Sequence, residues 1–207
     1  MEKHVSDKNI VQAKGIHTAS IFRIESMKAK ELQYQLTRIG AEFNQLKSMG
    51  LLTPQLMAQL FEKFSFYRDE LKRRFLVREY IIENITTTLW RTNIVARAAG
   101  DLTYDGVVDY GIFGDDPTSE TIADTELGNE TYRKAISAAY NVANQLHLES
   151  FLTAAEVADD FEEYGFVTDA TITPGTGQLT NRFTQPISKS ITEGLNMQSI
   201  ITYTDAT

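Results

Sequence analysis

Apolar residues in the N-terminal third of the chain recur with the seven-residue rhythm of a long amphipathic helix. Between residues 20 and 48 they are spaced mainly three or four positions apart, and Glu25 interrupts the series. This spacing gathers apolar side chains into one stripe, which another helix must cover. We therefore predict a helix over residues 20–48 and interpret its stripe as an oligomer interface. The predicted interface residues are Ala29, Leu32, Leu36, Ile39, Phe43 and Leu46.

A second amphipathic helix is predicted after a short connection. Gly50 suits the end of the first helix, and Thr53 followed by Pro54 is typical of a helix start. The second helix carries a broad apolar face that extends to Phe75. A connection of about five residues allows an antiparallel hairpin, although either helix could instead pack on another chain. A third helix is predicted over residues 84–99, which includes Trp90 as a packing anchor.

A cluster of cations lies late in the second helix and just beyond it. Positive side chains near a helix C-terminus interact favourably with the helix dipole, even when they only face solvent. The same cluster could form a docking patch for an acidic partner, and both interpretations remain open. The patch residues are Arg68, Lys72, Arg73, Arg74 and Arg78.

After Gly100 the pattern changes to short apolar runs separated by turns. Eight of the 12 glycines and three of the four prolines lie beyond this residue. We predict seven strands, at residues 107–113, 132–139, 145–152, 157–164, 178–183, 187–191 and 197–203. About seven strands in roughly 100 residues are typical of an antiparallel sandwich of jelly-roll or immunoglobulin-like type.

The predicted fold class is α+β, with long N-terminal helices (a helical hairpin or coiled-coil bundle) followed by an antiparallel β-sandwich. The predicted domains are an N-terminal arm at residues 1–18, a helical oligomerisation and docking region at 19–99, and a β-sandwich domain at 100–207.

Composition narrows the possible partners. The 207 residues carry a formal net charge of −8, which disfavours broad binding to nucleic acid. The chain has no cysteine, which excludes disulfides and thiolate metal sites. No run approaches the roughly 20 apolar residues of a membrane helix, and the N-terminus lacks the apolar segment of a signal peptide. We expect neither a membrane nor a nucleic-acid partner.

Residue patterns that indicate catalysis are sparse. Glycine motifs for nucleotides and the nucleophile elbow are absent. Acidic residues around Gly106 are faintly similar to a calcium loop, but their spacing differs, and solvated turn carboxylates explain them as well. We predict no catalytic, cofactor-binding or metal site, no cofactor, and no enzymatic activity. The three histidines lack metal-binding spacing: His4, His17 and His147.

Five blocks stand out in the C-terminal part: residues 100–114 (GDLTYDGVVDYGIFG), 124–135 (DTELGNETYRKA), 151–157 (FLTAAEV), 161–165 (FEEYG) and 177–179 (GQL). In this order they resemble a family of tailed-bacteriophage virion proteins, and the second block resembles the family pattern DTxLGNEVYRKA. The resemblance covers about residues 84–207. This chain departs from the family at Ile112 and Phe113, which replace small residues, and at Asp115 and Asp116 after Gly114.

The resemblance implies a non-enzymatic structural protein of the virion, made in the host cytoplasm. It would form a homo-oligomer, a trimer or a higher ring, and contact other virion proteins. A tail, baseplate or fibre position is favoured over the alternative of a capsid decoration or head-fibre protein. A second alternative is a receptor- or carbohydrate-binding module, for which aromatic side chains would stack on sugars. Candidates for such stacking are Tyr104, Phe113, Tyr140 and Phe166.

Overall fold

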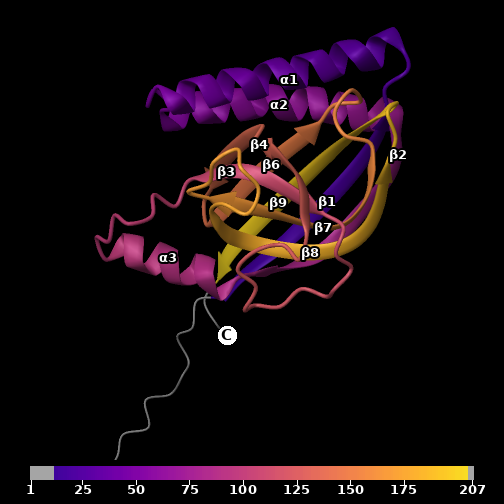
Figure 1. The fold of residues 1–207 in the computed structure, drawn as a ribbon. Coiled ribbons are helices and arrows are strands. Elements are labelled where there is room, and N and C mark those ends of the chain that lie inside the picture. Colours follow the sequence, from indigo (N-terminus) through magenta and orange to yellow (C-terminus); the bar gives the residue numbers. More distant parts are fainter. Residues whose placement is uncertain (1–11, 205–207) are drawn as a thin grey trace, which may run out of the picture.

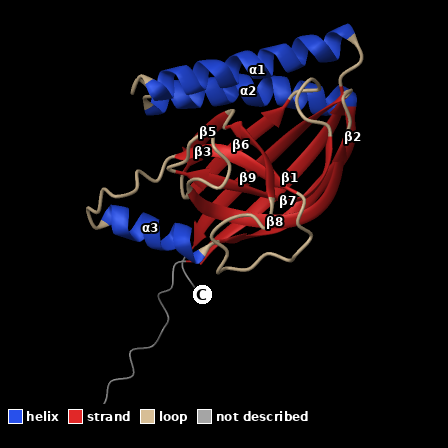
Figure 2. Cartoon of the chain, in the orientation of Figure 1, coloured by secondary structure: helices blue, strands red, loops and turns tan. Residues whose placement is uncertain are grey.

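The structure is a computed structural model that describes residues 12–204. Within this range the chain forms three helices and nine strands, and more residues lie in strands than in helices (Figure 2). The elements are β1 (Gln12–Arg23), α1 (Met27–Ser48), α2 (Pro54–Phe75), β2 (Leu76–Thr86), α3 (Thr88–Ala98), β3 (Val108–Gly114), β4 (Glu130–Ala135), β5 (Ala138–Val142), β6 (Gln145–Leu152), β7 (Asp159–Thr168), β8 (Gln178–Lys189) and β9 (Glu193–Thr204).

All nine strands belong to one antiparallel sheet with the order β4-β3-β7-β8-β2-β1-β9-β6-β5. Strands β2 and β8 pair at only two positions, Ile85 with Arg182 and Thr86 with Asn181. The sheet bends there, so that its two parts face each other across a shared core. A Cβ atom on Gly111 of β3 would lie only 2.7 Å from Cβ of Ser150 on β6, although β3 and β6 are not neighbours in the sheet.

The predicted fold class is wrong, because the N-terminal region is not a helical unit that precedes a sandwich. Strand β1 comes before the helices, and β1 and β2 both lie inside the sheet (Figure 1). The helices α1 and α2 are inserted between these two strands. Strand β2 is rich in Ile and also contains Val, Tyr and Thr, and β1 contains Ile16, Thr18, Ile21 and Phe22, all residue types that favour extended backbone. The face-to-face strands remain consistent with a sandwich-like arrangement.

The predicted division into domains also does not follow the sheet. Strand β1 spans the end of the predicted arm and the start of the predicted helical region, and β2 lies inside that helical region. Both strands share one sheet with β3–β9. Residues 1–11 of the arm lie outside the described residues.

Several local signals around the helices are confirmed, but the helix predicted at residues 20–48 begins later, at Met27, because residues 20–23 belong to β1. Thr53 is the N-cap of α2, its side chain accepts a hydrogen bond from the Leu56 N–H, and Pro54 opens the helix. Gly50 has a φ of 66° just after α1, a conformation that glycine adopts without strain. The helix predicted at residues 84–99 begins later, at Thr88, because Thr87 caps it through the Trp90 N–H.

The apolar stripe of α1 is buried inside this one chain. It faces α2 and the sheet, where it meets Leu60, Phe64 and Leu71 of α2 in a shared core. An interface between subunits would need these side chains to be exposed, so their assignment to an oligomer interface is wrong. Ala29, Leu32, Leu36, Ile39 and Phe43 are all buried, and Leu46 is half-buried against the same core.

We predict that Leu36→Ala lowers the free energy of unfolding by about 2–5 kcal/mol, because it leaves a cavity at a fully buried site. Urea denaturation of the purified protein measures this change. Tyr34→Ala on the same helix is the matched control: Tyr34 is 59% exposed, so we expect a change within about 0.5 kcal/mol. Dissociation of an oligomer by Leu36→Ala without loss of stability would contradict the intrachain role.

Candidate functional site

The blocks of residues 100–114, 124–135, 161–165 and 177–179 come together on strands β3, β4, β7 and β8. The centre of this region is Glu163 of β7, whose side chain is fully buried. Its carboxylate accepts hydrogen bonds from the backbone N–H of Gly128 (2.9 Å) and of Asn129 (2.7 Å). These bonds hold the end of the long connection between β3 and β4 against the sheet.

Arg182 of β8 completes this attachment. Its Nε donates to Oε2 of Glu163 at 2.9 Å, and its Nη1 donates to Oδ2 of Asp124 at 2.8 Å. Its Nη2 donates to the carbonyl oxygen of Thr118 at 2.9 Å. One buried guanidinium therefore joins two strands and the connecting loop. We call Glu163, Arg182 and Asp124, together with loop residues 115–129, the clamp.

The charges of the clamp alter its pKa values in a consistent way. Burial alone would raise the pKa of Asp124, but hydrogen bonds from Thr121 and the pairing with Arg182 outweigh it and lower that pKa. Burial would lower the pKa of Arg182, but Asp124 and Glu163 outweigh it and raise that pKa. Hydrogen bonds from Thr118 also lower the pKa of Asp116. The fold thus favours the ionised form of these three groups.

The clamp is also tightly packed. A Cβ atom on Gly114 would lie 2.5 Å from both Oε1 of Glu163 and the carbonyl oxygen of Asn129. The backbone at residue 114 can therefore approach these two atoms only because glycine lacks a side chain. Beside it, the buried side chains Ile112, Leu127, Val167 and Leu179 form a separate small apolar cluster. The clamp's polar groups bind one another, so its arrangement fixes a loop in place.

The predicted docking patch does not form a free positive surface. Arg68 pairs with the buried Glu149 of β6, and Lys72 lies 2.5 Å from Glu79. Asn196 and Gln198 of β9 donate to the same Glu149 carboxylate at 2.7 and 3.0 Å. The remaining three cations also have partners in the chain: Arg73 and Arg74 pair with Glu70, and Arg78 pairs with Glu193 and donates to the Ser188 carbonyl.

The structure therefore gives every cation of the patch a carboxylate within the chain. Arg68 is the one whose side chain is largely covered, and it attaches α2 to the sheet. Docking of an acidic partner at this cluster stays a prediction, with much of its charge already balanced.

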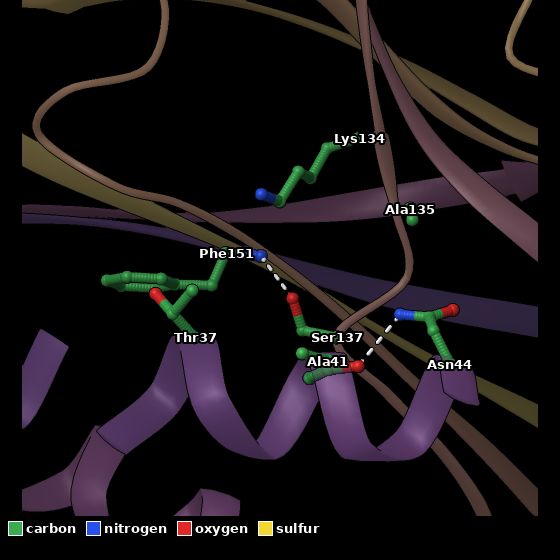
Figure 3. A pocket seen from close by; sticks show the side chains of 8 residues that line it. Thr37, Ala41, Asn44, Lys134, Ala135, Ser137 and Phe151 are labelled. Carbon is green, nitrogen blue, oxygen red and sulfur yellow. Dashed lines mark hydrogen bonds between the residues drawn. The ribbon is translucent and has the colours of Figure 1, made fainter. Parts of the chain in front are cut away.

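A small cavity lies where α1 crosses the link between β4 and β5 (Figure 3). Its volume is about 210 Å³, below the usual range for small-molecule sites. Its polar groups have partners: Nδ2 of Asn44 donates to the carbonyl oxygens of Gly40 and Ile136, and Oγ of Ser137 accepts from the Phe151 N–H. The cavity brings together no pair of groups suited to acid–base or nucleophilic chemistry.

The aromatic side chains considered for sugar stacking do not form a platform. Phe113 and Phe166 are fully buried, Tyr104 is half-buried, and Tyr140 stacks on Phe61 of α2 at 3.3 Å between ring centroids. Trp90 is buried and donates from Nε1 to the hydroxyl of Tyr203, as a packing anchor would.

The two histidines within residues 12–204 have different surroundings. His17 is buried and stacks on Phe183 at 3.9 Å between ring centroids, whereas His147 contacts Gln145 near the surface. His4 lies outside the described residues. Within residues 12–204, no group of three or more acidic or histidine side chains could hold a metal ion.

The acidic residues near Gly106 are used in local structure. Asp101 accepts from the Thr103 N–H and Asp105 from the Val107 N–H, as in tight turns. Asp109 pairs with Lys47 of α1 at 2.7 Å and accepts from the Ala170 N–H.

Sequence reasoning did not single out the three side chains that organise these networks, Glu149, Glu163 and Arg182. The signal for Glu163 and Arg182 was weak, because their strands carry many other polar residues, whereas Glu149 follows the apolar Leu148 in β6. A charge that is buried in such a strand requires a partner. What the sequence did not identify was the partner itself.

Comparison of the chain with family models, with curated proteins and with solved structures gave no match. None of the helices within residues 12–204 has the length and apolar character needed to cross a membrane.

We predict that Asp124→Asn lowers the free energy of unfolding by about 1–2 kcal/mol at neutral pH, because Arg182 loses a charged hydrogen-bond partner. Urea denaturation at pH 7 measures the change. Glu126→Gln removes a charge from an exposed position of the same loop and should leave stability within about 0.5 kcal/mol. Equal effects of the two substitutions would show that the Asp124 contact contributes nothing specific.

The lowered pKa of Asp124 also predicts how this difference depends on pH. A carboxyl group with a depressed pKa in the folded state stabilises the fold above its unfolded-state pKa of about 3.9, and this contribution is lost as the pH falls through the folded-state pKa. The stability difference between the natural protein and Asp124→Asn should therefore be constant above about pH 5 and shrink below about pH 4. Denaturation curves from pH 3 to 7 test this, and a difference that grows on acidification would contradict it.

Proposed function

We propose that this protein is a structural component of a tailed-bacteriophage particle and acts through assembly contacts. The observation that carries the proposal is that three of the five blocks that resemble the virion family meet at the clamp. Residues 124–135 supply Asp124, Gly128 and Asn129, residues 161–165 supply Glu163, and residues 100–114 supply Gly114. The blocks therefore specify one packed unit.

The chemistry of this unit supports a mechanical role. Its ionisable groups bind loop backbone and one another, and the residues of the resemblance contribute to holding a loop in position. Such a loop presents a fixed shape to a neighbouring protein in an assembly. We propose that the neighbours are other virion proteins and further copies of this chain, and that the protein resides in the virion.

We place the protein in the tail, baseplate or fibre apparatus, as the resemblance implies. A capsid decoration or head-fibre position is the alternative within the same class. A receptor- or carbohydrate-binding role would need an exposed aromatic surface other than Phe113 and Phe166, which are buried.

The test is the protein's presence and position in purified particles. We expect quantitative mass spectrometry to find it in particles purified on a density gradient, at a fixed ratio to the major capsid protein. Cryo-electron microscopy of the same particles should contain density for its nine strands and two 22-residue helices. Expression in infected cells with no copies in purified particles would overturn the proposal.

A further inference from the structure

The exposed part of β2 is the longest open strand edge next to the bend of the sheet. Leu76 and residues 78–84 pair with β1 on one side, and Val77 is the extra residue where the register with β1 shifts. On the other side β8 pairs only with Ile85 and Thr86, and no other strand among residues 12–204 pairs with β2. Alternate backbone N–H and C=O groups along this stretch therefore face outward without a strand partner. We call residues 76–84 the open stretch of β2.

The side chains of the open stretch are unusually apolar for an exposed edge. Ile81 is 72% exposed, Val77 is 39% exposed and Leu76 is 37% exposed. A long edge with exposed apolar side chains readily pairs with another extended chain. Charged residues flank the central sequence Tyr80-Ile81-Ile82, which itself carries no charge.

The facing strand β8 has protection that the open stretch lacks. Pro186 removes one backbone N–H in β8, and the ladder between β7 and β8 is irregular nearby, between Phe161 and Glu163. Arg78 also covers the end of β8, because its Nη2 donates to the carbonyl oxygen of Ser188 at 2.9 Å. The open stretch of β2 contains no proline, and its one irregularity lies at its start, where the register with β1 shifts at Val77.

We propose that the open stretch of β2 is an interface between two copies of this chain, in which β2 of one copy pairs antiparallel with β2 of the other. An unpaired edge is self-complementary in this arrangement, because a two-fold axis brings the same row of donors and acceptors together from both copies. The exposed Ile81 side chains lie near the centre of the paired region, where pairing covers them.

The charges at the two ends of the open stretch favour the same arrangement. Arg78 lies near one end and Glu83 near the other, and antiparallel pairing places the Arg78 end of one strand beside the Glu83 end of its partner. Arg78 also pairs with Glu193 of its own chain, but its side chain is 41% exposed and has donors left for a second carboxylate. Glu83 is exposed and takes part in none of the ion pairs found within residues 12–204. A parallel arrangement would instead bring like charges together.

This inference goes beyond the proposed function, since it concerns contact between copies and can be tested on the purified protein. It also differs from the predicted trimer or ring. A two-fold interface closes as a dimer, so a ring would need a second kind of contact.

The test uses the full-length protein and sedimentation velocity at about 1 to 100 µM. We expect a concentration-dependent dimer whose dissociation constant rises about tenfold or more in Ile81→Lys, because a charge at the centre of the edge opposes pairing. Val77→Lys is a second variant with the same expected direction. Val95→Lys is the matched control: Val95 is 69% exposed on α3, so the dimer should persist unchanged. Thermal unfolding confirms that each variant is folded.

Cross-linking adds a test of geometry, since the chain has no cysteine of its own. Single cysteines at positions 77, 79, 81 and 83 should give disulfide-linked dimers with one maximum along the strand, and a cysteine at position 95 should give none. A monomer throughout the concentration range, or a dimer that survives both lysine substitutions, would overturn the proposal. Loss of the dimer on removal of residues 1–11 would assign the contact to the N-terminal segment and also overturn it.

Discussion

The hydrogen bonding of β1 on both of its edges is the constraint on which the rest of the structure depends. Strand β1 pairs with β2 at nine positions and with β9 at twelve, which joins Gln12 to Thr204 near the two ends of the chain. The sheet is therefore complete only when β1 and β9, the first and last strands in the sequence, pair with each other. Strands β1 and β2 are adjacent in the sheet, but α1 and α2 lie between them in the sequence. The chain therefore leaves the sheet after β1, forms both helices and returns to the sheet as β2. Their apolar stripe is buried by the same chain for this reason.

Two buried carboxylates determine where the outer elements attach to this sheet. Glu149 and Glu163 are both fully buried, and each meets an arginine and additional hydrogen-bond donors. A buried carboxylate that lost its partners would destabilise the fold by several kcal/mol, so each network allows one position of the attached element. Glu149 fixes α2 through Arg68, and Glu163 fixes the loop between β3 and β4. These ionic contacts add positional specificity to a fold whose main stabilisation is apolar burial.

Local features of the fold could be predicted from the sequence, and long-range ones could not. The strand at residues 145–152 coincides with β6, and Thr53 with Pro54 marked the start of α2, because alternation and capping are local. The strands predicted at 178–183 and 187–191 are one strand, β8, since Pro186 is tolerated within it. The apolar period of α1 correctly indicated a side to be buried. It did not indicate what covers that side, which depends on β1 pairing with residues about 180 positions away.

The same limit applies to the charged sites. The cations from Arg68 to Arg78 were found from their spacing, but two of their partners, Glu149 and Glu193, lie on distant strands. The cations that the sequence suggested as a free positive patch are therefore paired with carboxylates in the fold. In the same way, Glu163 is adjacent in sequence to another acidic residue, Glu162, whereas its neighbours in space are Arg182 and the backbone of Gly128.

The order of the elements also determines which strand edges stay open. At the ends of the sheet, β4 and β5 are joined through Ile136 and Ser137, whose N–H groups donate to the backbone carbonyl oxygens of Asp109 on β3 and Glu149 on β6. This link, covered by α1 through Asn44, connects the two outermost strands and limits their exposure (Figure 3). At the bend, β8 turns away from β2 because a short turn, residues 190–192, connects it to β9, which must reach β1. The divergence of β2 and β8 thus follows from the same pairing of β1 and β9 that closes the fold.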